Sequence, residues 1–379
     1  MDFAFTEEQE DLRETARAYL AENASSERVR AAMEGDSGWD DVLWTQLGEE
    51  LGWTAVHIPE EYGGLGLGYV EFVALLELMG ERVVCSPYFA TLALGANAIL
   101  CAGTPEQKER LLGPIAEGAC TATLAFTEPN GRWDLSGIET VCEAAGDGYV
   151  LRGTKRYVVD GDRADLLIVA AREPGTEGEA GIHLFAVPAD TPGVSRKALP
   201  TVDQTRRQAE VAFDGVTVPA EARLGGEGEG GPALIRTLDL AAVALAAEQV
   251  GGAQRCLDMA VEYASERVQF GRVIGSFQSI KHKCADMMVE VEAARSAVYY
   301  AACVAAEQDE ELSQVAPLAK AYCSDAYFRC AADNIQIHGG VGFTWEYDCH
   351  MYFKRAKASE TFLGDPAYHR ELVAQRIGL

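Results

Sequence analysis

The sequence predicts an α+β protein with helices at both ends and a small β-barrel or sandwich in the middle. Apolar residues recur at helical spacing before residue 118 and again after residue 229. Short runs of β-type residues, separated by turn residues, fill the part between them. We therefore expect an N-terminal helical domain at residues 1–118, a β domain at 119–228 and a C-terminal four-helix bundle at 229–379.

The N-terminal domain contains two clear helix starts. Thr6 is followed three residues later by Gln9, which is the pattern of a capping box. Thr104 precedes Pro105, and proline suits the first helical position because the amide there has no partner within the helix. Between these starts, a glycine-rich turn at 60–66 leads into residues 69–80, which have the apolar spacing of a further helix.

The β domain is inferred from six apolar or β-branched runs with Gly, Asp and Pro between them. Such residues favour strands because they pack well on a pleated surface. The glycine-rich segment 225–231 closes the domain, and we expect it to be a linker or a mobile loop. The six runs are 121–126, 148–151, 157–159, 166–170, 182–187 and 211–213.

Three long segments predict the helices of the C-terminal domain: 233–267, 278–308 and 317–338. Gly251 and Gly252 interrupt the first of them. Since glycine has no side chain, this pair would allow another helix to pack closely there.

Composition excludes several classes of partner. A net charge of -27 over 379 residues repels nucleic acid and anionic lipid. No apolar run approaches the roughly 20 residues of a membrane span, and the acidic start does not resemble a signal peptide. The ten Cys residues form no CxxC pair and have no zinc-finger spacing with His, which favours reduced thiols and no metal. Cys349 and His350 are neighbours in what reads as a loop, but sequence neighbours rarely form a catalytic pair. We expect a cytoplasmic protein.

Five short motifs occur in a fixed order, and together they resemble the acyl-CoA dehydrogenase family. Its members are flavoproteins that introduce a double bond between the α and β carbons of CoA thioesters. The resemblance covers nearly the whole chain and implies that family's fold, with FAD as cofactor and an acyl-CoA as substrate. The motifs are Pro59-Glu60-Glu61-Tyr62-Gly63-Gly64, Thr127-Glu128-Pro129, Arg267-Val268-Gln269-Phe270-Gly271, Phe277-Gln278, and Gln336 with Gly339-Gly340.

The resemblance also implies roles for individual residues. Thr127 would serve the flavin ring, and Arg267 would match the charge of the pyrophosphate. In the family's tetramers the flavin lies between two subunits, and the Arg and Gln-Gly-Gly motifs reach into the neighbour's site. The residues implied in cofactor binding are Thr127, Arg267, Gln269, Phe270, Gln336, Gly339 and Gly340.

The chain departs from the family where it would serve its own flavin and substrate. A catalytic glutamate commonly precedes the glycine matching Gly364, but here that residue is Leu363, which cannot accept a proton. The base position used by other members falls on Ala241. The bulky pair Arg132-Trp133 replaces small residues, and Tyr157-Val158-Val159 replaces a Trp-Ile-Thr sequence whose Thr bonds the flavin.

These departures suggest a subunit that completes the site of a related, catalytic subunit in a mixed tetramer. The resemblance suggests a bulky substrate, such as a steroid side-chain CoA ester, and an electron-transferring flavoprotein as acceptor. Two alternatives stay open. One is a self-sufficient homotetramer whose base is another carboxylate, with Glu360 and Asp365 as weak candidates. The other is a binding or scaffold protein that has lost flavin and turnover.

Overall fold

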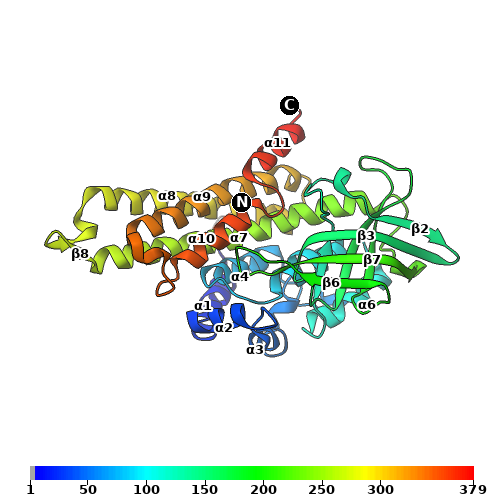
Figure 1. Ribbon diagram of the computed structural model, residues 1–379, viewed down its shortest axis with the longest axis horizontal. Helices are drawn as coiled ribbons and strands as arrows, with labels where there is room; N and C mark the ends of the chain where they lie inside the picture. The colour runs from blue at the N-terminus through cyan, green and yellow to red at the C-terminus, as the bar shows by residue number, and fades with distance from the viewer. Residues whose placement is uncertain (1–4) are drawn as a thin grey trace. The chain divides into compact units, whose positions relative to one another are not determined.

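The computed structural model describes residues 5–379, and the chain divides into two compact units (Figure 1). The helical unit takes the residues up to 34, 69–84 and 242–379, and the sheet unit takes 35–68 and 85–241. The α+β fold class is confirmed, because helices precede and follow a β domain along the chain. The domain boundaries after residues 118 and 228 stay a prediction from sequence.

The helical unit begins with the predicted capping box. The Thr6 hydroxyl accepts the Gln9 amide at 3.2 Å, and the Gln9 side chain accepts the Thr6 amide at 3.0 Å. The hairpin of β8 (Val268–Gln269) and β9 (Arg272–Val273) and the short helices η7 (Ile274–Ser276) and η8 (Gly339–Phe343) connect longer helices. These are α1 (Glu7–Asn23), α2 (Ser26–Glu34), α4 (Tyr69–Glu81), the later part of α7 (Gly230–Glu266), α8 (Gln278–Ala306), α9 (Leu312–His338), α10 (Cys349–Thr361) and α11 (Pro366–Arg376).

Glycines let α4 and α7 pack backbone to backbone. A β-carbon added to Gly251 would lie 1.8 Å from the Glu77 carbonyl oxygen, and one added to Gly80 would lie 2.1 Å from that of Glu248. The close approach predicted for Gly251 is therefore confirmed. A buried ion pair between Glu248 and Arg355 joins α7 to α10.

The sheet unit carries one mixed seven-stranded sheet. Its strand order is β1-β4-β2-β3-β7-β6, with β5 paired to β4, and β1 runs parallel to β4. The strands are β1 (Ala122–Ala125), β2 (Val141–Ala145), β3 (Gly148–Val159), β4 (Leu166–Arg172), β5 (Ile182–Pro188), β6 (Val194–Ala198) and β7 (Gln208–Pro219). The remaining elements are α3 (Asp41–Thr45), α5 (Asn97–Ala102), α6 (Pro105–Ala116), the start of α7, and the short helices η1 (Gln46–Glu50), η2 (Trp53–Ala55), η3 (Glu60–Tyr62), η4 (Phe89–Ala96), η5 (Leu135–Gly137) and η6 (Ala220–Ala222).

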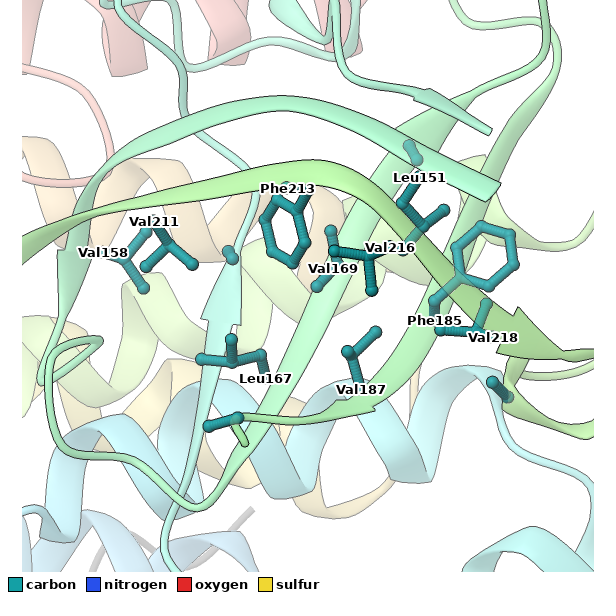
Figure 2. Close-up of a cluster of buried hydrophobic side chains, with 14 of the residues drawn as sticks. Leu151, Val158, Leu167, Val169, Phe185, Val187, Val211, Phe213, Val216 and Val218 are labelled. Carbon is teal, nitrogen blue, oxygen red and sulfur yellow. The ribbon is translucent and has the colours of Figure 1, made fainter. Parts of the chain in front are cut away.

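The sheet curls around the side chains that it buries. Figure 2 shows these side chains converging from β3, β4, β5 and β7 on one apolar core. Phe185 and Phe213 are the largest members, and both are buried. Burial of this apolar area, at roughly 25 cal/mol per Å², is the main force that closes the sheet.

Three predictions for the β domain needed correction, two about strands and one about the closing linker. Runs 148–151 and 157–159 belong to one strand, β3, whose pairing with β7 shifts between Lys155 and Val158. The mostly exposed strands β2 and β6 were missed, because an apolar pattern marks only strands that bury a face. The predicted linker 225–231 is partly wrong, since α7 already begins at Gly230.

Helix α7 alone, among the helices within residues 5–379, is long and apolar enough to cross a membrane. However, 72% of its most apolar window is buried inside the protein. A core helix passes the same test of length and composition, so α7 gives only weak support for a membrane span.

Candidate active site

The hairpin after α7 presents three of the predicted cofactor residues. Arg267 lies just before β8, Gln269 ends that strand, and both are exposed. Phe270 and Gly271 have φ of 54° and 76°, the positive values that a two-residue type I′ turn requires. Phe270 is 91% exposed, and its ring meets the Phe277 ring edge-on at 6.1 Å.

The end of α9 and the start of η8 present three more of them. Gln336, Gly339 and Gly340 are exposed, and Gly339 has φ of 67°, which strains any other residue. Within the described part of the chain, β-carbons added to the two glycines would meet no heavy atom within 4 Å. This end of α9 is therefore open to the close approach of a ligand.

One ring contact joins the last turns of α7 and α9. Tyr263, four residues before Arg267, stacks on His338 with ring centroids 4.2 Å apart. His338 also contacts the Asn334 carbonyl oxygen at 2.9 Å through Nδ1. The ring of His338 thus packs against α7. We refer to Arg267, Gln269, Phe270, Gln336, Gly339 and Gly340 as the bundle end.

Leu363, at the position where the resemblance implies a base, lies in a constrained turn between α10 and α11. Its φ of 61° is unusual for a branched residue, and its side chain is 5% exposed. Lys320 Nζ donates to the carbonyl oxygens of Glu360 and Gly364 at 3.2 and 3.1 Å. His369 Nε2 lies 3.0 Å from the Leu363 carbonyl oxygen. The turn is therefore fixed by side chains, while Leu363 itself supplies only an aliphatic surface.

The two weak base candidates make ordinary structural contacts. Glu360 pairs with Lys357 at 2.6 Å, and Asp365 accepts the Tyr368 amide at 2.8 Å as the N-cap of α11. Ala241, at the alternative base position on α7, is fully buried and aliphatic. A catalytic role for Glu360 or Asp365 stays a prediction.

Thr127 lies in the sheet unit, just beyond β1. Its hydroxyl donates to the Arg156 carbonyl oxygen at 2.7 Å, and the Arg156 amide donates to the Thr127 carbonyl oxygen at 2.9 Å. Val159 ends β3, the strand that contains Arg156, and is almost fully buried. Tyr157 has φ of 61° and is 36% exposed. We refer to residues 126–128 and 155–159 as the flavin edge.

The bulky pair Arg132-Trp133 follows the Thr127 motif. Arg132 forms an ion pair with Asp134 at 3.0 Å. The Trp133 ring lies 6.0 Å from the Phe126 ring, so the indole lies next to the flavin edge. A side chain of this size takes space that the small residues of the family leave free.

Three buried cations, which the sequence reasoning missed, fix these segments. Burial lowers the pKa of Lys320 to about 7 and that of Lys155 to about 8. Arg172, in β4, donates four hydrogen bonds to carbonyl oxygens in the loops 135–138 and 178–180. The sequence did contain a signal for these residues, because each one occupies a position that faces the core in its helix or strand. Lys and Arg are rarely buried unless they are paired.

The thiols and histidines do not form a metal centre. Within residues 5–379, no three His, Cys, Asp or Glu side chains lie close enough to hold a metal ion. All ten thiols are free. Cys349 is buried at the start of α10, rather than in a loop as expected, and burial raises its pKa to about 11.

The donor set fits one part of FAD better than the other. The bundle end offers a guanidinium, two carboxamides and an open glycine pair, which suit phosphates and an adenosine. The flavin edge offers the Thr127 hydroxyl, but Val159 has a methyl group where the family has a second hydroxyl. The residues therefore fit the phosphates and adenosine of FAD well and its flavin ring poorly.

Family models and a known relative match this chain along nearly its whole length. Models of the acyl-CoA dehydrogenase N-terminal, middle and C-terminal domains match residues 6–119, 123–216 and 228–378. The chain is 36% identical to acyl-CoA dehydrogenase IpdE2 of Mycolicibacterium smegmatis, over 95% of this chain and 96% of that protein.

Two solved structures are also similar. The ChsE4-ChsE5 complex of Mycobacterium tuberculosis has a TM-score of 0.90 at 29% identity, over 100% of this chain and 99% of the other. The Tcur3481-Tcur3483 steroid ACAD has a TM-score of 0.88 at 33% identity, over 98% of both chains. This chain therefore belongs to the acyl-CoA dehydrogenase family of FAD-dependent oxidoreductases.

Proposed function

We propose that this chain is an acyl-CoA dehydrogenase subunit that completes the flavin site of a related catalytic subunit in a mixed tetramer. One contrast carries the proposal. The residues that would reach a neighbour are exposed and open, whereas the position that should hold the base carries buried Leu363.

The bundle end supports the first half of the contrast. Arg267 and Gln336 are exposed at segments that the Tyr263–His338 stack holds together. An exposed guanidinium and an open glycine pair are well suited to a pyrophosphate and an adenosine that arrive with another subunit. A similar complex of two named chains, ChsE4 and ChsE5, supports a mixed assembly.

The lost base supports the second half. Dehydrogenation removes a proton from the α carbon, and a positioned general base accelerates such a transfer by roughly 10²–10⁴-fold. Leu363 and Ala241 cannot take this proton. Bound FAD would supply the acceptor for the hydride that leaves the β carbon. The proton must then go to a carboxylate of the related subunit.

We further propose that the substrate is a bulky CoA thioester, such as one with a steroid side chain. The similar steroid ACAD supports this substrate class. The electrons would pass to an electron-transferring flavoprotein, as the family resemblance suggests.

The test is flavin content. The chain would be purified alone and together with a co-encoded relative, and FAD per tetramer would be measured from the absorbance of released flavin. We expect a mixed tetramer with flavin at half of its sites and activity that depends on the relative.

The other outcomes decide between the alternatives. A yellow, active homotetramer of this chain alone would reject the partner role and favour a self-sufficient enzyme. Absence of flavin from every assembly would favour the scaffold alternative.

A further inference from the structure

A buried ion pair holds the residues on either side of Thr127. Lys155 Nζ lies 2.6 Å from Glu128 Oε1, and both side chains are almost completely inaccessible. Lys155 Nζ also donates to the Phe126 carbonyl oxygen at 3.2 Å. Lys155 thus contacts the residue before Thr127 and the residue after it.

The pair is tied into the sheet on both sides. Glu128 Oε1 also accepts the Thr140 amide at 2.8 Å. Arg156, next to Lys155 along β3, exchanges two hydrogen bonds with Thr127. Segment 126–128 is therefore joined to residues 155 and 156 by four polar contacts, where β3 shifts register against β7.

Such a pair is a costly way to fill a core. Desolvation penalises both charges, and it lowers the pKa of Lys155 to about 8 despite the adjacent carboxylate. Apolar residues of the same volume often give equal or greater stability. What charge-assisted hydrogen bonds add is a fixed direction, and these bonds act on the main chain that carries Thr127.

We propose that Lys155 and Glu128 are positioning residues for Thr127, which keep the flavin edge in its binding geometry. The inference rests on the proposed function and extends it. This chain has lost side chains that face the flavin ring, but it has kept the main-chain scaffold of its own half-site. That half-site is latent, and restoring the facing side chains recovers flavin binding.

The test begins with restoration of the family's residues in Trp133→Ser, Tyr157→Trp and Val159→Thr combined. The restored chain is co-purified with the related subunit, and FAD per tetramer is measured. We expect occupancy to rise from half to full, because the scaffold is already in place. Occupancy that stays at half would overturn the proposal.

The second step removes the ion pair in the restored chain. Lys155→Met with Glu128→Gln leaves no buried charge and keeps an acceptor for the Thr140 amide. We expect the melting temperature to hold, while occupancy falls back to half and the visible flavin spectrum reverts. Lys155→Arg, which keeps the charge, should retain part of the gain. Full occupancy in the neutral pair variant would show that the pair does not position Thr127.

Two controls separate positioning from general stability. Arg355→Met with Glu248→Gln removes a buried ion pair of the helical unit and should leave occupancy full. If the neutral pair at 155 and 128 does not fold, Glu128→Asp replaces it, because it keeps the charge and shortens the reach. Full occupancy with Glu128→Asp would also overturn the proposal.

The failure of this proposal can be told apart from that of the proposed function. If the unrestored assembly already holds flavin at every site, the partner role fails. The neutral pair is then introduced into the unrestored chain, where loss of flavin supports positioning and retention rejects it.

Discussion

The bundle end and the flavin edge, which the family resemblance assigns to the two halves of a flavin site shared between subunits, differ from each other in this chain. The bundle end keeps every motif residue and presents these residues to solvent, with Phe270 91% exposed. The flavin edge keeps its hydrogen-bonded main chain but carries Val159 and Tyr157 where the family has Thr and Trp. Under the proposed function, this chain has therefore lost its own half of a shared site and kept the half that it lends to another subunit.

The largest effect that tests the difference between the bundle end and the flavin edge is expected when the positive charge of Arg267 is removed. In the mixed assembly, Arg267→Met should weaken flavin binding by about 10²-fold, since losing one partner of a desolvated charge pair costs about 2–5 kcal/mol. The measurement is a flavin titration of the apo-assembly followed by fluorescence.

The matched control at the flavin edge is Thr127→Ala. Because this chain's own half-site is proposed to be empty, the substitution should leave flavin affinity unchanged. Equal losses of flavin affinity in Arg267→Met and Thr127→Ala would mean that the bundle end and the flavin edge both bind flavin. The proposed difference between the two regions would then be wrong.

Acid titration tests the turn at Leu363. Burial and the nearby Lys320 lower the pKa of His369 to about 3, against about 6.5 in the unfolded chain. Between these values the unfolded state binds more protons, so this contribution to stability is complete above pH 6.5 and falls as pH drops toward 3.

His369→Asn should therefore flatten the loss of stability between pH 7 and pH 4, by an amount on the order of a few kcal/mol. Urea unfolding at the two pH values measures it. His57 in the sheet unit also has its pKa lowered by burial, to about 4. His57→Asn is therefore the matched variant and should reduce the same pH dependence of stability. An unchanged slope in His369→Asn would show that this histidine does not carry the effect.

The glycine pair allows a finer test of the bundle end. Gly339→Ala places a β-carbon at a φ of 67°, which should cost about 1–2 kcal/mol and lower the melting temperature by a few degrees. Gly340→Ala meets open space among the described residues and should be nearly neutral for folding. Calorimetry measures the melting temperature of both variants. A larger loss of stability in Gly340→Ala than in Gly339→Ala would contradict the argument from the positive φ of Gly339.

The smallest effects are expected at the two candidate bases. Glu360→Gln loses a surface ion pair of about 0–1 kcal/mol, and Asp365→Asn keeps a good N-cap. Turnover of the mixed assembly should be unchanged in both. A drop of 10²-fold or more in either variant would identify a base in this chain and would favour the self-sufficient enzyme.

The sequence was a good guide wherever a local pattern decides the structure. Thr6 and Gln9 form the predicted capping box, and Gly251 lies where α4 and α7 meet. It was a poor guide to β2 and β6, because strands that bury neither face have no apolar period. It also divided β3, because the mostly polar residues 152–156 separate its two apolar runs. The register against β7 shifts after Leu151 and again after Lys155.

For the site, the sequence by itself determined which side chains exist. Leu363 cannot take a proton and Val159 cannot donate a hydrogen bond, whatever the fold. Only the tertiary structure showed that Lys155 lies against Glu128 or that Lys320 and His369 hold the Leu363 turn. Lys155 and Glu128 are 27 positions apart, and Lys320 and Gly364 are 44 positions apart. The apolar period of a sequence shows which face of a helix or strand is buried. Whether two buried charges pair depends on the distance between their side chains, which is set by the packing of the elements in the folded protein.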